Sequence, residues 1–264
     1  MSSRETLRET FESAAALYDA ARPTYPEELF DDLVELAQLR PGGRLLEIGC
    51  ATGKATRPLL SRGFSVVCVE LGAQLAERAR TNLDGLPVEI NVAPFEAWEG
   101  GGEFDLVFAA TAWHWLDPAT RYRKAHALLR PRGHLAFWSA LHAFPAGFDP
   151  FFAEIQEVYD AIGESFEGEF PPAPPEQVPD DRAEIEASGL FEDVHVRRYL
   201  WETEYTTEEY IDLLNTFSGH IAMEAPKREH LYASIRRRIG GGRVRRHWYA
   251  ILHVARRNEP RSRV

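Results

Sequence analysis

The sequence has few of the residues that build disulfide frameworks, zinc sites or membrane spans. Among its 264 residues only Cys50 and Cys68 are cysteines, and each lies in or beside an apolar run typical of a buried strand. A cysteine in that setting behaves as a small hydrophobic side chain, so no disulfide framework and no metal site are expected. No stretch approaches the roughly 18 apolar residues of a membrane helix, and the polar N-terminus lacks the apolar region of a signal peptide. We therefore expect a cytoplasmic protein without a membrane span.

Positive charge is also scarce. The 30 Lys and Arg residues are outnumbered by 41 Asp and Glu residues, which gives a formal net charge of −11. Because binding to a phosphate backbone relies on a dense excess of Lys and Arg, this balance disfavours nucleic acid as a partner. The C-terminal stretch is locally basic, which favours a solvated, salt-bridged surface and leaves an anion-binding face as the alternative. Its basic residues include Lys227, Arg228, Arg236, Arg237, Arg238, Arg243, Arg245, Arg246, Arg256 and Arg257.

The hydrophobic pattern predicts two leading helices followed by alternating strands and helices. Apolar residues at helical spacing predict a helix over 4–20 that ends near Arg22 and Pro23, and a second helix that begins at Pro26. From Arg44 the pattern changes to short, nearly continuous apolar runs separated by helical stretches. These runs cover residues 45–49, 65–70, 88–93, 104–110 and 134–140. Such strands favour a parallel sheet that is covered on both faces.

Beyond residue 139 the regular alternation breaks. A proline-rich loop around 171–179 cannot be helix or strand interior, so this region is a candidate lid or acceptor-binding insert, with a plain connecting loop as the alternative. Thr206 and Glu209 have the spacing of a capping box, which predicts the start of another helix. The further elements expected are a helix over 150–162, a strand over 194–205, a helix over 226–239 and a last strand over 247–257.

A glycine-bearing turn joins the first predicted strand to the next helix. A dinucleotide-binding G-x-G-x-x-G that starts at Gly49 would need glycine at the positions of Ala51 and Lys54. A phosphate-binding P-loop needs four residues between its glycines and a Ser or Thr after its lysine. Here three residues separate Gly49 from Gly53, and Ala55 follows the lysine. Neither phosphate-binding motif is present.

The motif that remains is E-x-G-x-x-x-G, formed by Glu47, Gly49 and Gly53. It resembles the cofactor loop of class I S-adenosylmethionine-dependent methyltransferases. The glycines, together with Cys50 and Ala51 between them, would let the backbone approach a bulky nucleoside and its amino-acid tail. Glu47 could accept a hydrogen bond from the cationic amino group of that tail, directly or through water. The family often has a third glycine where this chain has Ala51.

The ends of the second and third predicted strands extend the resemblance. Glu70 lies 21 residues after Gly49, where a carboxylate accepts both ribose hydroxyls in this architecture; alone, an acid at a strand end is usually solvated. Leu71 would then pack on the adenine. After the third strand the family commonly has a polar side chain that contacts the adenine amino group, but this chain has Pro94. We therefore expect an apolar adenine pocket that uses Phe95, with core packing as the equal alternative for that residue.

The segment after the fourth predicted strand resembles the type 11 and trans-aconitate methyltransferase-like branches of the family. In these branches it faces the methionine moiety and the acceptor. The matching residues are Thr111, Ala112, Trp113 and His114. His114 is the candidate general base, because the ordinary pKa of histidine lies near about 6.5. Cofactor packing or a structural hydrogen bond is the alternative role for His114.

The N-terminal segment resembles the same branches. There a leading helix closes over the cofactor, a tyrosine lies near the sulfonium and an arginine reaches the methionine carboxylate. The matching residues here are Tyr18, Arg22 and Tyr25. Lid packing and a surface arginine are the alternative interpretation.

The resemblance implies an α/β fold with a Rossmann-like, seven-stranded, mostly parallel sheet, an antiparallel last strand, helices on both faces and helical lid inserts. Residues 1–140 would hold the lid helix and the cofactor-binding half, and residues 141–264 the acceptor-side insert helices and the closing strands of the same domain. The implied activity is methyl transfer from S-adenosylmethionine to a small-molecule or short-peptide acceptor at O, N or C, carboxylates included, by a monomer or homodimer. The alternatives are a non-enzymatic S-adenosylmethionine-binding protein and, less favoured, an NAD-dependent oxidoreductase.

Overall fold

The structure, a computed structural model, describes residues 15–166 and 168–259. Most of the predicted leading helix, residues 4–14, lies outside these residues. Its described end is α2 (Ala15–Ala21), which stops immediately before Arg22 and Pro23 as the sequence predicted. The second predicted helix is α3 (Glu27–Leu36), with Pro26 as its N-terminal flanking residue.

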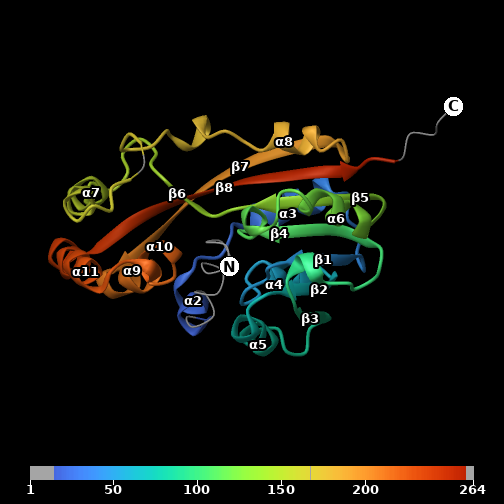
Figure 1. Cartoon of the computed structure of the whole chain (residues 1–264), viewed down its shortest axis with the longest axis horizontal. Helices are drawn as coiled ribbons and strands as arrows, with labels where there is room; N and C mark the ends of the chain where they lie inside the picture. The colour runs from blue at the N-terminus through green and yellow to red at the C-terminus, as the bar shows by residue number, and fades with distance from the viewer. Residues whose placement is uncertain (1–14, 167, 260–264) are drawn as a thin grey trace.

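The described residues form one eight-stranded sheet in the order β3-β2-β1-β4-β5-β8-β6, with β7 also paired to β8 (Figure 1). The pairs from β3 to β5 are parallel, whereas β8 runs antiparallel to β5, β6 and β7. The predicted Rossmann-like, mostly parallel sheet with an antiparallel last strand is therefore confirmed. The strands are β1 (Arg44–Ile48), β2 (Ser65–Glu70), β3 (Val88–Val92), β4 (Phe104–Ala110), β5 (Leu129–Trp138), β6 (Leu141–Ala143), β7 (Phe191–Thr206) and β8 (Arg243–Arg257).

Helices cover both faces of the parallel part of the sheet. Successive strand residues point to opposite faces, so Leu45 packs with one hydrophobic cluster and Leu46 with the other. The first cluster lies under α3, α4 (Thr56–Ser61) and α5 (Ala73–Asn82), and the second under α6 (Arg121–Leu128) and α8 (Arg182–Ala187). Burial on both faces explains why these strands read as nearly continuous apolar runs rather than as alternating ones.

The two C-terminal strands extend well past the parallel sheet. β7 and β8 pair over their whole length, from Phe191 opposite Arg257 to Thr206 opposite Arg243, except for a local irregularity between Glu192 and His195. On the other edge of β8, β5 and then β6 pair with it in the same antiparallel register. The far end of this ribbon carries a group of helices, which we call the cap module (Figure 1). Its members are α7 (Phe151–Ala161), α9 (Thr207–Leu214), α10 (Ser218–Ala222) and α11 (Ala225–Ile239).

The cap module has a hydrophobic core of its own, which includes Phe152, Tyr210, Leu231 and Trp248. The predicted insert helices are α7 and α11, and the predicted capping box begins α9: the Glu209 N–H donates to Thr206 Oγ1 at 3.4 Å, and the Thr206 N–H donates to Glu209 Oε2 at 2.7 Å. The short elements β6, α8 and α10 were not predicted. No helix in the described ranges is long and apolar enough to cross a membrane.

Candidate functional site

Two adjoining cavities open at the carboxyl ends of the central strands, where β1 and β4 lie side by side although they are not consecutive in the chain. Open α/β sheets bind their ligands at such a change in strand order. The main cavity has a volume of about 270 Å³. The side cavity is smaller and lies between α2 and the glycine loop. Tyr18, Arg22, Gly49, Ala51 and Thr111 line both.

The glycine loop after β1 needs its two glycines for conformation and for close packing. Gly49 has a φ of +71°, and a Cβ there would lie 2.7 Å from the Ala112 Cβ. Gly53 has a φ of +88°, and a Cβ there would lie 2.8 Å from Leu83 Cδ1. Ala51 adopts a φ of +48°, a left-handed conformation that costs an L-residue about 1–2 kcal/mol. In this loop conformation the backbone of Gly49, which has no side chain, forms part of the cavity wall.

Glu70, at the end of β2, lies in the wall of the main cavity. Its side chain is held by two backbone donors: the Ala51 N–H donates to Oε2 at 2.8 Å, and the Gly72 N–H donates to Oε1 at 2.9 Å. The residue is 6% exposed. Both oxygens are therefore oriented by the glycine loop and the next turn, and a carboxylate oxygen can accept more than one hydrogen bond.

Glu47, on β1, lies in the side cavity and is buried. The Thr56 hydroxyl donates to its Oε2 at 2.6 Å. Burial raises the pKa of Glu47 to about 8, and the nearby Glu70 carboxylate adds to the rise. At neutral pH the Glu47 carboxyl is therefore mostly protonated until a cation reaches it.

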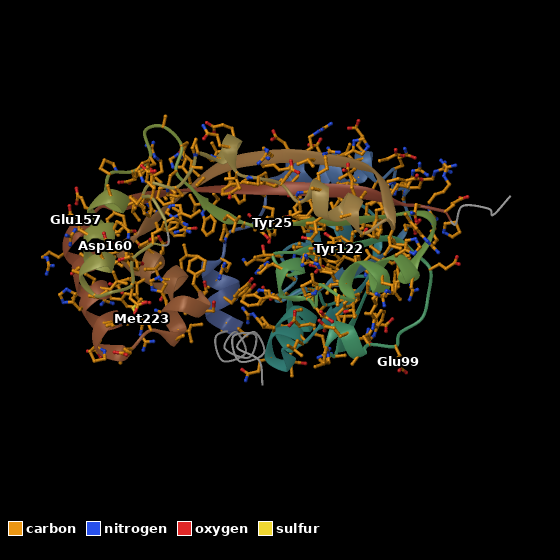
Figure 2. All side chains as sticks on the ribbon, turned by 45° about the horizontal axis from the view of Figure 1, so that its top comes forward. Tyr25, Glu99, Tyr122, Glu157, Asp160 and Met223 are labelled. Atoms are coloured by element: carbon orange, nitrogen blue, oxygen red, sulfur yellow. The ribbon has the colours of Figure 1, made fainter. Side chains whose placement is uncertain are left out.

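Thr111, directly after β4, has the second strained backbone at the site. Its φ of +56° is an outlier for a β-branched residue, and such strain often gathers at functional sites. Thr111 Oγ1 accepts from the Ala140 N–H at 3.2 Å and shares a 2.8 Å hydrogen bond with the Tyr25 hydroxyl. Figure 2 shows Tyr25 in the middle of the molecule, between the cap module and the parallel sheet. The Tyr25 ring packs edge-on against the Trp138 ring, with 5.7 Å between the ring centroids.

Arg22 connects the end of α2 to the cap module. Its Nε donates to Thr216 Oγ1 and its Nη2 to the Thr216 carbonyl oxygen, each at 2.8 Å. The guanidinium also lies 4.0 Å from the centre of the Phe217 ring, and Phe217 and Ser218 line the main cavity. The segment that closes this side of the cavity therefore comes from residues about 200 positions after α2 in the chain.

The structure brings most of the predicted site residues together. Trp113 is an exception: it is 4% exposed and stacks on Phe137 at 5.0 Å, in the core beneath the site and away from both cavities. Gly53 also lies outside the cavity walls and acts through its packing on Leu83. Of the other predicted residues, Leu71, Pro94, Phe95, Ala112 and His114 line the main cavity, and Tyr25 and Cys50 line the side cavity.

Several residues in the cavity wall were not predicted. Leu75, Ala93 and Leu116 lie close to predicted positions in the chain, so an amphipathic helix pattern and strand ends could have indicated them. Leu141, Phe217 and Ser218 have no local motif and reach the cavity only through the fold. Within the described residues, no group of three or more His, Cys, Asp or Glu side chains is placed to hold a metal ion.

Residues 46–137 match the family model of a methyltransferase domain. An uncharacterized methyltransferase of Mycobacterium tuberculosis is 35% identical over 133 residues, which cover 50% of this chain and 53% of that protein. A ubiquinone biosynthesis O-methyltransferase of Xanthomonas axonopodis is 34% identical over 118 residues, which cover 42% of this chain and 49% of that protein. The chain thus spans about half the length of these curated relatives.

Solved structures agree with this likeness at the level of the fold. A putative type II methyltransferase from Anaeromyxobacter dehalogenans aligns with a TM-score of 0.64 at 21% identity and covers 89% of this chain and 97% of that one. A phosphoethanolamine N-methyltransferase of Haemonchus contortus, in complex with S-adenosylmethionine, aligns with a TM-score of 0.55 at 16% identity and covers 98% of this chain and 60% of that one. The narrower assignment to the trans-aconitate methyltransferase-like branch is tested by none of these likenesses and stays a prediction.

Proposed function

We propose that this chain transfers a methyl group from S-adenosylmethionine to a small-molecule or short-peptide acceptor at O, N or C. Its residues 46–137 match the model of a methyltransferase domain and form part of a Rossmann-like sheet. The observation that carries the proposal is the position of Glu70 in the wall of the main cavity, with both carboxylate oxygens oriented by the N–H groups of Ala51 and Gly72. A carboxylate presented in this way suits the two hydroxyls of a ribose.

The residues around the two cavities fit the other parts of this cofactor. Leu71, Leu75, Pro94 and Phe95 supply an apolar wall for a purine. Gly49 has no side chain, so its backbone can approach the ligand directly, and a Cβ at this position would clash with Ala112. A cationic amino group and a carboxylate at the other end of the ligand would meet Glu47 and Arg22 in the side cavity. When bound, S-adenosylmethionine supplies a methyl group that its sulfonium has already activated.

The protein then has to align an acceptor with that methyl group and exclude water. Reacting atoms have to be held about 3 Å apart, and orientation alone can supply much of the acceleration. We assign the proton transfer that a phenol, amine or carbon acid needs to His114, which lies at the mouth of the main cavity beside Trp115. A carboxylate acceptor needs no base. Residues 141–264 contribute the cap module and so, in this proposal, the acceptor side.

The decisive test of the cofactor is calorimetric titration with S-adenosylmethionine, S-adenosylhomocysteine and NAD. Wild-type protein is expected to bind the first two and not NAD. Glu70→Ala removes the ribose acceptor and should weaken binding by about ten- to a hundredfold, because hydrogen bonds to charged groups contribute on that scale. Glu89→Ala, at an exposed position on β3, is the matched control and should bind as wild type does. A preference for NAD, or no binding of any of the three, would contradict the proposal.

Turnover tests the second half of the proposal. Formation of S-adenosylhomocysteine is followed with a panel of phenols, amines and carboxylates. With a phenol or amine acceptor, His114→Asn should lower kcat by about 10²–10⁴-fold and leave cofactor affinity unchanged, because general-base catalysis contributes that much. An unchanged kcat would remove His114 from this role. We further expect a cytoplasmic monomer or homodimer, which cell fractionation and light scattering would test.

A further inference from the structure

The outer edge of β7 is a strand edge that has no partner strand among the described residues. β7 pairs with β8 along one edge only, and the two strands run side by side as a long ribbon (Figure 1). With 16 residues, β7 is the longest strand that the structure describes. An open edge presents a row of backbone N–H and C=O groups that can pair with a further strand. This edge is therefore a candidate interaction surface.

The residues whose backbone faces the open edge follow from the hydrogen bonds of β8. Arg245 lies opposite Glu204, but its N–H donates to Asp149 Oδ2 at 2.9 Å and so does not bond β7. Glu204 and Arg245 are thus a non-hydrogen-bonded pair, and the Glu204 carbonyl accepts from the Arg243 side chain at 3.1 Å. Such pairs alternate along the ladder, so every second residue of β7 points its N–H and C=O groups away from β8. The next three in this alternation are Glu202, Leu200 and Arg198.

The middle of this edge is apolar and exposed. Leu200 is 52% exposed, more than any other large hydrophobic side chain in the part of the chain that the structure describes. It lies opposite Tyr249, which belongs to a small hydrophobic cluster with Ala143 and Ile251 on the same face of the ribbon. Leu200 would therefore extend an existing apolar surface if a second side chain covered it.

The charges on either side of Leu200 have opposite signs. The preceding segment is basic, with His195, Arg197 and Arg198, and the following segment is acidic, with Glu202 and Glu204. An antiparallel copy of the strand brings the basic segment of each chain to the acidic segment of the other. Opposite charges across an antiparallel pair stabilise it, whereas like charges destabilise it. The sequence of β7 is therefore complementary to itself.

The charged residues of the edge have partners within the chain that still leave room for another. Arg198 pairs with Asp180 at 3.6 Å, and Glu202 pairs with the exposed Arg245 at 3.7 Å. The second pair is part of the solvated, salt-bridged surface that the sequence favoured for the C-terminal stretch. Both distances are long, and a guanidinium or a carboxylate can bond several partners at once. These pairs therefore do not prevent contacts with a second molecule.

We propose that two copies of this chain associate through their β7 edges, antiparallel and with a two-fold axis at Leu200. Leu200 of each copy then faces Leu200 of the other, and Arg198 of each copy faces Glu202 of the other. These are the residues whose backbone points outward, so each of these pairs can exchange two hydrogen bonds. A shift of two residues in either direction would place Leu200 opposite a charged side chain. The interface is isologous, as in most homodimers.

This surface is separate from the proposed methyltransferase site. None of Arg198, Leu200 and Glu202 lines either cavity. One pair of strands buries less than a standard interface of roughly 1,600 Å², so we expect association in the micromolar range. The proposal can therefore succeed or fail whether or not the protein binds S-adenosylmethionine.

The test measures the mass of the whole protein in solution against its concentration. Analytical ultracentrifugation from about 1 to 200 µM should show wild type shifting from the chain mass of 29.9 kDa to twice that mass. Leu200→Lys places two like charges at the axis, and Arg198→Glu places a carboxylate opposite Glu202. Each change occurs twice in the dimer and should weaken association by about ten- to a hundredfold. Arg197→Glu, at an exposed position on the other face of β7, is the control and should associate as wild type does.

A charge exchange tests the register itself. Glu202→Arg places Arg opposite Arg198 and should also weaken self-association. An equal mixture of the Arg198→Glu protein and the Glu202→Arg protein should recover a dimer, because every Glu then faces an Arg. A chain that carries both substitutions should dimerise again by itself. A purely structural role of either residue within one chain predicts no recovery on mixing.

Three results would overturn the proposal. The first is wild-type protein that keeps the mass of a single chain over the whole range, and the second is a dimer that neither Leu200→Lys nor Arg198→Glu weakens. The third is a failure of the mixed charge variants to associate. Circular dichroism verifies that each variant folds, which we expect because these side chains are exposed and exposed ion pairs contribute only about 0–1 kcal/mol.

Discussion

Replacement of Glu47 by glutamine should make the stability of the protein less dependent on pH. In the folded protein burial raises the pKa of Glu47 from 4.5 to about 8. Between these two values the unfolded chain ionises this carboxyl while the folded chain keeps it protonated, so the unfolded state binds fewer protons. Each pH unit in that range therefore lowers the free energy of unfolding by about 1.4 kcal/mol. The loss reaches about 5 kcal/mol above pH 8 and is absent below pH 4.5.

The assay is urea unfolding at pH 5.5, 6.5, 7.5 and 8.5. Glu47→Gln keeps an oxygen that can accept from the Thr56 hydroxyl but has no proton to lose. The free energy of unfolding of the variant, minus that of wild type, should therefore grow by about 1.4 kcal/mol per pH unit up to pH 7.5 and then level off. Glu157→Gln, at an exposed position on α7, is the control and should show no such growth (Figure 2).

A difference in the free energy of unfolding between Glu47→Gln and wild type that is the same at every pH would refute this reasoning.

The Glu47 carboxyl should also release a proton when S-adenosylmethionine binds, if the proposed function holds. A cationic amino group beside Glu47 favours its ionised form, so S-adenosylmethionine binding at pH 7 should release about one proton from wild type and none from Glu47→Gln. Calorimetry in two buffers of different ionisation enthalpy measures that number, and affinity should rise with pH until it levels off near pH 8.

Two further substitutions test the local conformations at the site and in the cap module. Gly49→Ala places a Cβ 2.7 Å from that of Ala112 at a φ of +71°, whereas Gly147→Ala, at a φ of +78° with open space around it, introduces backbone strain without a clash. Thermal melts should show that Gly49→Ala lowers the free energy of unfolding by about 1–3 kcal/mol more than Gly147→Ala does. Equal decreases for the two variants would mean that Ala112 moves aside at no energetic cost. Thr206→Ala removes the side-chain cap of α9 and should cost about 1 kcal/mol in urea unfolding, so unchanged stability would mean that the bond from the Glu209 N–H contributes nothing.

The sequence alone determined the parallel sheet and the glycine loop, because both depend on residues that are near one another in the chain. Apolar runs at 45–49 and 65–70 indicated buried strands by their continuity, and these are β1 and β2. The spacing of Gly49 and Gly53 distinguished the loop from phosphate-binding loops, and Glu70 followed from its place at a strand end. The carboxyl ends of parallel strands meet at one edge of the sheet, so local patterns sufficed to bring these residues together.

The direction of single side chains near that edge needed the fold. Trp113 was predicted to contact the cofactor because its segment resembles the one that faces the methionine moiety in related methyltransferases, but it turns into the core and stacks on Phe137. The short turn Trp113–Trp115 places consecutive side chains on different sides, and neither its composition nor its spacing shows which residue is buried.

Tertiary structure alone decided the part of the cavity wall that the cap module contributes. Phe217 reaches the main cavity because α2 and the cap module meet through Arg22 and Thr216, residues that are 194 positions apart. Arg246 is next to the exposed Arg245 in the sequence, but it points to the opposite face of β8 and is buried there, 5.5 Å from the centre of the Phe217 ring. Contacts between residues far apart in the chain arise only on folding, so the motif of the glycine loop could be predicted from the sequence whereas this part of the cavity wall could not.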